Sequence, residues 1–246
     1  MKQTKLIMGM PISVEVIDSQ VTLIDFKDIF RLFKKVDEQF SPYKKTSEVS
    51  RINRKEINPL EYSSEMKEII DLSEKAKIKT DGYFDVYHKN YFDPSGIVKG
   101  WVIQKAVELL RGRGFKDFYI DAGGDIYASG LKDKKKWRVG IRNPFKYSEV
   151  IKVVSLSNQA IATSGTAIRG DHIYNPHQKD KSRSQIASVS VLGKSILEVD
   201  LLATATFAMG EKGIDFINAY KSVESYMIDG KGIATYTSGL EKYLES

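Results

Sequence analysis

The spacing of apolar residues along the chain predicts several amphipathic helices. Phe26, Ile29, Phe30, Phe33 and Val36 recur three or four positions apart, which places them on one face of a helix. The predicted helices are residues 25–40, a short capped turn at 46–53, 64–80, a helix that begins after residue 100 and ends before residue 112, 197–209, and 213–221.

Shorter stretches alternate apolar and polar residues between turn signals, and these predict strands. The predicted strands are residues 6–17, 115–120, 126–129, 137–141, 151–156, 159–163, 187–192, 225–229 and 233–237. Strands come in runs with helices set between them, which favours an α+β fold over a doubly wound parallel sheet. No repeat or linker divides the chain, so we expect residues 1–246 to form a single domain.

The composition excludes several classes of protein. The chain has 246 residues, 41% of them hydrophobic and 28% charged, as in ordinary soluble globular proteins. No apolar run approaches the ~20 residues that a membrane helix needs. The absence of cysteine excludes disulfides, thiol catalysis and cysteine-bound zinc. The N-terminus lacks the apolar segment of a signal peptide, so a cytoplasmic protein is expected. A secreted or lipid-anchored form whose leader has been removed is the alternative.

The net charge of +6 includes a cluster of lysines at positions 132 and 134–136. A solvated hairpin tip explains such a cluster. A nucleic-acid patch would have aromatic residues interleaved with the lysines, whereas only Trp137 adjoins them. We therefore expect no nucleic-acid partner, although the positive excess would help to attract an anionic ligand.

The stretch from Asp93 to Gly100 has the features of a phosphate site. Pro94, Ser95 and Gly96 predict a turn, and the helix that follows would present backbone N–H groups and the positive end of its dipole. Lys99 adds a positive charge at the same place. The stretch matches neither the phosphate loop of nucleotide triphosphatases nor the glycine pattern of dinucleotide-binding folds. An ordinary junction between a loop and a helix is the alternative reading.

The predicted helix 197–209 carries a carboxylate among apolar residues. Asp200 and Thr204 stand four positions apart and so project from one face. A carboxylate on a buried helix is costly unless it is paired, hydrogen-bonded or bound to a metal. Asp200 could therefore cap or pair locally, with Thr204 bonding to the helix backbone. In the other interpretation, both side chains are hard oxygen ligands for Mg²⁺ at a phosphate-handling site.

Two further groups of residues are open to more than one reading. Asp121-Ala122-Gly123-Gly124-Asp125 lies between two predicted strands, where its glycines serve either a tight turn or a close backbone approach. His88 fits a surface position. His172 directly follows Asp171, but neighbouring residues of a strand point to opposite faces, so the two side chains need not be in contact. Three scattered histidines without cysteine make a zinc site an unfavoured interpretation.

Short sequence blocks run in a fixed order through almost the whole chain. They are Met8-Gly9-Met10, Phe40-Ser41-Pro42-Tyr43, 47–53, Gly82-Tyr83-Phe84-Asp85-Val86, 93–100, 121–126, Ala162-Thr163-Ser164-Gly165, His172-Ile173-Tyr174-Asn175-Pro176 and 200–204. This series resembles the FAD:protein FMN transferase family, the ApbE-type flavin transferases. The resemblance implies an ApbE-like, T-fold-related single domain with a mostly antiparallel sheet and packed helices.

The resemblance also implies a function and a set of site residues. It implies that the protein binds Mg²⁺ and takes FAD as its substrate. The FMN moiety would be transferred to a threonine hydroxyl of an acceptor flavoprotein, and AMP would be released. The residues that match the FAD-holding positions are Met8, Tyr43, Tyr83, Phe84, Asp85, Asp93, Lys99 and Tyr174. The implied metal ligands are the Gly96 carbonyl, Asp200, Thr204 and the Ala203 carbonyl. His172 stands at the position of the proposed general base.

The chain departs from the family pattern at Pro94, Ser95 and Asn175. Asn175 replaces an Asp that could have oriented His172. Two other functions stay open at this point, an FAD pyrophosphatase that uses water as the acceptor and a flavin-binding protein without turnover. His172 and the Asp200/Thr204 pair favour an enzyme, whereas the identity of the acceptor protein is not readable from the sequence.

Overall fold

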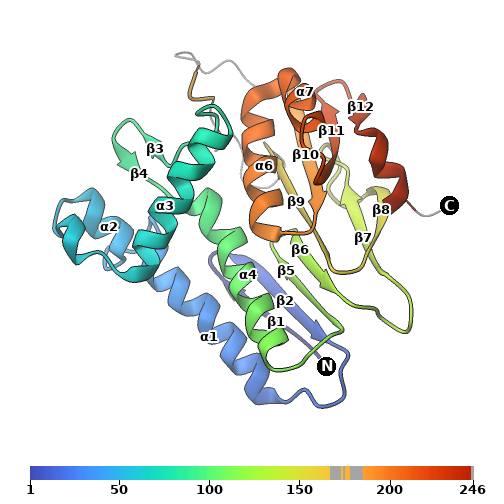
Figure 1. Ribbon diagram of the computed structural model, residues 1–246, viewed down its shortest axis with the longest axis horizontal. Coiled ribbons are helices and arrows are strands. Elements are labelled where there is room, and N and C mark those ends of the chain that lie inside the picture. Colours follow the sequence, from blue (N-terminus) through green and yellow to red (C-terminus); the bar gives the residue numbers. More distant parts are fainter. Residues whose placement is uncertain (167–172, 174, 178–184, 245–246) are drawn as a thin grey trace.

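The structure is a computed structural model, which describes residues 1–166, 173, 175–177 and 185–244. Its centre is an eight-stranded sheet in the order β1-β2-β5-β6-β9-β10-β11-β12, in which every neighbouring pair is antiparallel (Figure 1). The strands are β1 (Lys2–Ile7), β2 (Met10–Val16), β5 (Phe118–Ala122), β6 (Asp125–Ser129), β9 (Gln159–Gly165), β10 (Ile186–Gly193), β11 (Val223–Asp229) and β12 (Ala234–Tyr236). The α+β fold with a mostly antiparallel sheet is thus confirmed.

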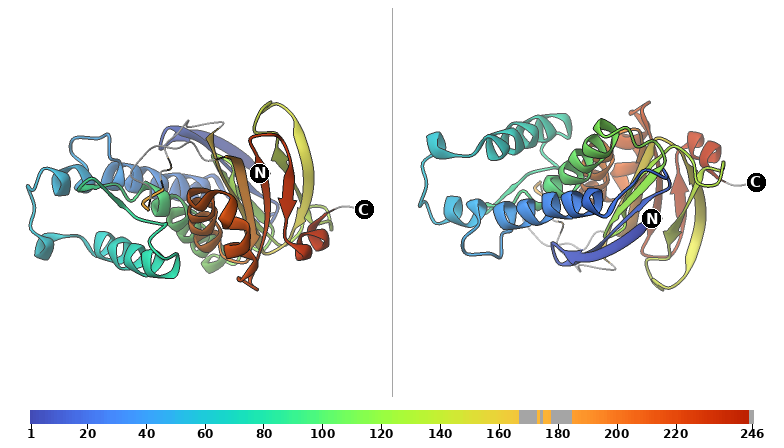
Figure 2. Two further views of the ribbon diagram at one scale, coloured as in Figure 1. Left: turned by 90° about the horizontal axis from the view of Figure 1, so that it is seen from above. Right: turned by 90° about the horizontal axis from the view of Figure 1, so that it is seen from below.

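Helices cover one face of this sheet and a separate hairpin covers the other (Figure 2). The helical layer contains α1 (Leu23–Phe40), α4 (Ser95–Gly112) and α6 (Ile196–Met209), with α7 (Gly213–Asn218) beside β11. The hairpin is β7 (Trp137–Arg142) paired with β8 (Val150–Leu156). A larger apolar core fills the helical side, and a smaller one, which includes Trp137, Val139 and Val154, lies under the hairpin.

The remaining elements extend from the helical layer, away from the β7–β8 hairpin (Figure 1). They are α2 (Glu48–Asn53), α3 (Ser64–Lys79), and the short strands β3 (Tyr87–His88) and β4 (Tyr91–Phe92). Short 3₁₀ helices lie at Pro59–Glu61, Gly210–Lys212 and Ser238–Tyr243. In the described part of the chain, no helix is both long enough and apolar enough to cross a membrane.

Capping residues set the ends of the long helices. Thr22 accepts a hydrogen bond from the N–H of Asp25, whose side chain in turn accepts from the Thr22 N–H, so a capping box starts α1. Ser195 caps α6 by accepting a hydrogen bond from the N–H of Glu198. Helix α6 is buried on most sides because the sheet, α4 and α7 surround it.

Two predicted boundaries are wrong. The predicted strand 6–17 is a hairpin, β1 and β2, joined at Met8 and Gly9, which have φ angles of 56° and 72°. A two-residue turn of this kind needs positive φ at both positions, and the apolar pattern continues across it. Helix α4 begins at Ser95 rather than after Gly100, with Pro94 at its N-cap. Proline is tolerated there because the first N–H groups of a helix have no partner within it.

Candidate functional site

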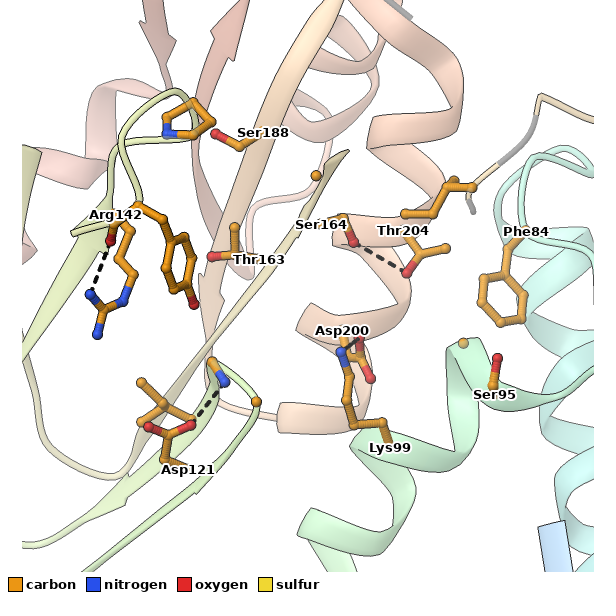
Figure 3. A pocket seen from close by; sticks show the side chains of 18 of the residues that line it. Phe84, Ser95, Lys99, Asp121, Arg142, Thr163, Ser164, Ser188, Asp200 and Thr204 are labelled. Atoms are coloured by element: carbon orange, nitrogen blue, oxygen red, sulfur yellow. Dashed lines mark hydrogen bonds and ion pairs between the residues drawn. The ribbon is translucent and has the colours of Figure 1, made fainter. Parts of the chain in front are cut away.

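A pocket of about 690 Å³ opens at one end of the sheet (Figure 3). The β5–β6 turn, Gly123–Gly124, and the last residues of β9, Thr163–Gly165, form its floor. The first turns of α4 and one face of α6 bound it on the helical side, and β7 with the loop that follows bounds it on the hairpin side. A pocket of this size can hold a ligand of several hundred daltons.

Helices α4 and α6 meet at Gly100 and Asp200. The N–H of Gly100 donates to Oδ2 of Asp200 at 2.9 Å. A Cβ at position 100 would lie 3.0 Å from the same oxygen and 3.1 Å from the Cα of Leu197, so only glycine permits this approach without displacement. Thr204, one turn further along α6, faces Gly96, because a Cβ at position 96 would lie 4.0 Å from the Thr204 methyl group. The two segments that the sequence singled out therefore lie side by side.

The carbonyl of Gly96 lies one helical turn before this contact. In a regular α-helix, the N–H of Gly100 would be committed to this carbonyl four residues earlier. Here that N–H donates to Asp200, and a carbonyl oxygen has two lone pairs. Gly96, Asp200 and Thr204 all line the pocket.

Lys99 lies between two buried carboxylates. Its Nζ is 2.5 Å from Oδ2 of Asp125 and 3.6 Å from Oδ1 of Asp200. The residues Asp125 and Asp200 are only 1% and 3% exposed. Burial raises the pKa of the Asp200 carboxyl above its ordinary value, and the nearby Lys99 ammonium opposes that rise. Among the residues that the structure describes, one ammonium thus faces two carboxylates, which leaves this group short of positive charge.

This shortage of positive charge fits a divalent cation. Buried carboxylates are stabilised by pairing or by metal coordination. Asp200, the Thr204 hydroxyl and the Gly96 carbonyl supply hard oxygens, the ligand type that Mg²⁺ prefers, and Mg²⁺ commonly takes its remaining ligands from water and phosphates. Among the described residues, no group of three or more His, Cys, Asp or Glu side chains converges as a metal site. A metal site built from protein side chains alone, such as a zinc site, is therefore not indicated in that part of the chain.

Five of the residues expected to hold FAD line the pocket: Lys99 on α4, and Tyr83, Phe84, Asp85 and Asp93 in the segment before α4. The N–H of Phe84 donates to Thr80 Oγ1 at 3.0 Å, and its ring touches the Cβ position of Gly96 at 3.3 Å. Asp93 accepts from the N–H of Ser95 at 2.9 Å. These contacts fix the segment that leads into α4.

Further contacts position Tyr83 and Asp85. Asp85 pairs with Lys77 at 2.8 Å and accepts from the N–H of Tyr87. The Tyr83 ring lies 4.4 Å from the ring of His177 between centroids. His177 Nε2 also lies 2.7 Å from the carbonyl oxygen of Asp81. His177 thus packs beside Tyr83 and the Asp81 carbonyl.

Several predicted residues lie elsewhere. Tyr43 is 91% exposed and Met8 occupies the β1–β2 turn, and neither is among the described residues that line the pocket. The loop of Tyr43 still comes close, because the hydroxyl of Tyr91, a pocket residue, donates to the Pro42 carbonyl at 3.3 Å. Ala203 is fully buried in α6. His172 and Tyr174 lie outside the described residues.

The hairpin side of the pocket was not predicted from the sequence. Arg138 and Arg142 of β7 line it, together with Tyr119 and Asp121 of β5 and Tyr147 of the loop after β7. Arg142 donates to the Tyr147 carbonyl at 3.1 Å, and Asp121 accepts from the N–H of Gly124 at 2.9 Å. A usable signal was present, since Arg138 and Arg142 alternate with the buried Trp137, Val139 and Ile141 and so share one face of a strand.

Comparison with known proteins places the chain in a family. The model of the ApbE family matches residues 8–91 and 86–227, so this chain belongs to the ApbE family. The FAD:protein FMN transferase of Vibrio cholerae is 25% identical over 244 residues, which cover 75% of this chain and 73% of the relative. The FAD:protein FMN transferase of Treponema pallidum is 30% identical over 155 residues, which cover 55% of this chain and 43% of the relative.

Solved structures show the same fold. The flavin transferase ApbE from Vibrio cholerae superposes with a TM-score of 0.86 at 23% identity and covers 99% of both chains. The ApbE protein from Thermotoga maritima has a TM-score of 0.86 at 20% identity and covers 100% of this chain and 99% of its own. The expected ApbE-like fold is thereby confirmed.

Proposed function

We propose that this protein is an Mg²⁺-dependent FAD:protein FMN transferase that moves the FMN moiety of FAD to a threonine hydroxyl of an acceptor flavoprotein and releases AMP. The observation that carries the proposal is the convergence of Lys99, Asp200 and Thr204 in one pocket, on two helices held together at Gly100. The names of the family relatives support the choice of FAD as the substrate.

The proposed chemistry is a displacement at phosphorus. The threonine oxygen forms a bond to the phosphorus of the FMN half, and the bond from that phosphorus to the bridging oxygen breaks. The bridging oxygen leaves with AMP, and the threonine proton passes to a base. Reactions of this type depend on positioning and on neutralisation of the phosphate charge more than on covalent help from the protein.

Different residues of the pocket would contribute to different parts of this reaction. Lys99 would bind a pyrophosphate oxygen and stabilise charge that develops as the bridging bond breaks, an effect worth roughly 3–4 kcal/mol per donor in other enzymes. Asp200, Thr204 and the Gly96 carbonyl would hold Mg²⁺, with the Ala203 carbonyl as a further proposed ligand. When bound, the ion would supply charge neutralisation and in-line orientation of the diphosphate.

Other residues would bind the flavin nucleotide and accept the proton. Phe84 and Tyr83 present aromatic surface next to α4, and Asp85 and Asp93 flank it with carboxylates. Met8, Tyr43 and Tyr174 are proposed to contribute to FAD binding on the basis of the family resemblance. His172 is the proposed base, since imidazole has a pKa near 6.5 and exchanges protons readily at neutral pH.

The test mixes the purified protein with FAD, Mg²⁺ and an acceptor flavoprotein fragment that carries a candidate threonine. Mass spectrometry of the fragment and chromatography of the nucleotides are recorded together. We expect FMN to become covalently attached to the threonine with AMP released in equal amount. AMP and free FMN without a modified fragment would instead identify an FAD pyrophosphatase, and unchanged FAD would identify a flavin-binding protein without turnover.

Two variants separate the proposed roles. Asp200→Ala is expected to abolish transfer and to weaken Mg²⁺ binding. His172→Ala is expected to abolish transfer while Mg²⁺ binding is retained. Full activity of His172→Ala would show that another group accepts the proton.

A further inference from the structure

Asp125 is a buried carboxylate whose role the proposed reaction leaves open. It begins β6, is 1% exposed, and accepts a hydrogen bond at Oδ1 from the N–H of Thr163 at 3.2 Å. Its other oxygen, Oδ2, lies 2.5 Å from Lys99 Nζ. The backbone of β9 therefore fixes one oxygen of Asp125, and the second oxygen points at the lysine of the pocket.

Lys99 forms ion pairs with two carboxylates, and that of Asp125 is the closer one. The distance to Asp125 is 2.5 Å, whereas the distance to Asp200 is 3.6 Å. Asp200 is also held from the opposite side by the N–H of Gly100. Without the Asp125 carboxylate, we expect the ion pair between this ammonium and Asp200 to tighten, because an uncompensated buried charge is strongly unfavourable.

We propose that Asp125 is a positioning residue that draws Lys99 toward itself and so weakens the ion pair between Lys99 and Asp200. Asp200 then stays available to a divalent cation, and Lys99 stays in the pocket beside that cation, where both can meet one diphosphate. The metal-related part of this inference rests on the proposed function. The competing explanation is that Asp125 acts on Asp200 only through its own negative charge, without holding Lys99.

A double-mutant cycle in Mn²⁺ affinity separates these explanations. The four proteins are the unsubstituted chain, Asp125→Asn, Lys99→Met, and the combination of both. Asparagine retains an oxygen that can accept from Thr163, so the isosteric change removes the charge with little change of shape. Mn²⁺ binding to each protein without FAD is measured by electron paramagnetic resonance, in which the signal of the free ion falls as it binds.

If Asp125 holds Lys99, Asp125→Asn lets the ammonium move closer to Asp200 and compete with the metal. Mn²⁺ affinity then falls by about tenfold, and Lys99→Met restores affinity at least about fivefold more in the Asp125→Asn background than in the unsubstituted protein. If Asp125 acts only through its own negative charge, Lys99→Met changes Mn²⁺ affinity by the same factor in both backgrounds. That additive result would overturn the inference.

Asp121→Asn is the matched control. Asp121 lines the same pocket and also belongs to the β5–β6 region, but it accepts the N–H of Gly124 instead of pairing with Lys99. In the double-mutant cycle of Asp121→Asn with Lys99→Met, the effects of the two substitutions on Mn²⁺ affinity should be additive. Equal coupling in the Asp121 and Asp125 cycles would show that the effect is not specific to the lysine contact and would also overturn the inference.

Thermal unfolding in excess chelator tests the pairing without any metal. Lys99→Met should lower the melting temperature, since it leaves both carboxylates buried without their ammonium, and Asp125→Asn should recover part of the loss in that background. Absence of recovery would contradict the pairing. If neither the unsubstituted protein nor its FAD complex binds Mn²⁺, the metal site on which both proposals depend is refuted. An additive cycle with normal Mn²⁺ binding would refute only the inference about Asp125.

Discussion

The backbone N–H of Gly100 donates to Oδ2 of Asp200 at 2.9 Å, across the contact between α4 and α6. This bond joins residues 100 positions apart in the chain and holds the carboxylate at the edge of the pocket. It exists because glycine allows the two helices to approach until backbone meets side chain. The site therefore depends on the fit of two helices as much as on the side chains that they carry.

Substitution of Gly100 by alanine is predicted to reduce both stability and activity. The new Cβ would lie 3.0 Å from Asp200 Oδ2 and 3.1 Å from the Cα of Leu197, so α6 must move. Overpacking typically costs about 1–3 kcal/mol, which exceeds the gain of about 1 kcal/mol from better helix propensity. We expect a lower melting temperature and at least a roughly tenfold loss of transfer rate, since Asp200 is displaced by a fraction of an ångström.

Gly112→Ala provides the control on the same helix. A Cβ there would have no neighbour within 4 Å, and the residue is exposed at the end of α4. This variant should gain up to about 1 kcal/mol and keep its activity. Equal behaviour of the two alanine variants in calorimetry and in the transfer assay would show that close approach at Gly100 is unimportant.

Removal of the Thr204 hydroxyl is predicted to raise the Mg²⁺ requirement. Thr204 lines the pocket one turn after Asp200, and its Oγ1 lies 3.4 Å from Ser164 Oγ. Thr204→Val keeps the shape of the side chain but removes an oxygen ligand. The Mg²⁺ concentration at half-maximal rate should rise by roughly tenfold or more, as when metal sites lose a supporting group.

Thr204→Ser retains the hydroxyl and should show nearly the original Mg²⁺ dependence. The comparison is made by titrating Mg²⁺ at saturating FAD and acceptor. Identical titration curves for the valine variant and the unsubstituted protein would exclude Thr204 as a metal ligand.

The carboxyl of Asp121 is predicted to make the protein less stable as the pH rises. Burial raises the pKa of this group above its ordinary value of 3.8. The folded protein therefore holds the proton more tightly than the unfolded chain does. Its contribution to stability is greatest below pH 3.8 and diminishes as the pH rises through the window above that value.

Asp121→Asn lacks this titration while it can still accept from Gly124. Melting temperatures of the two proteins are measured from acid to neutral pH in the absence of metal. As the pH rises, the melting temperature of the asparagine variant should increase relative to that of the unsubstituted protein. A constant difference would show that Asp121 has the same pKa in both states.

The sequence predicted the elements whose patterns are local. The helix α1 follows from the apolar spacing between Phe26 and Val36, and α6 follows from its almost uninterrupted apolar run. The start of α4 was misplaced because Pro94 and Gly96 disfavour a helix interior but are acceptable in its first turn. The β1–β2 turn was missed because Met8, a residue without turn preference, adopts positive φ there.

The helical half of the site could be predicted, whereas the hairpin half could not. Spacing puts Asp200 and Thr204 on one face of a helix, and the family resemblance pairs them with the Gly96 region. Which side chain meets Lys99 depends on tertiary packing, because Asp125 reaches it from a strand 26 residues further on. Arg138 and Arg142 likewise join the pocket only through the fold of the β7–β8 hairpin over the sheet.

The most direct measurement is a crystal structure of the protein with FAD and Mn²⁺, in which anomalous scattering locates the ion. The account predicts a peak at a coordination distance of about 2 Å from an oxygen of Asp200 and from the Thr204 hydroxyl, with phosphate oxygens of FAD completing the ion's ligands. A peak remote from both residues, or FAD bound outside the pocket between α4 and α6, would contradict it.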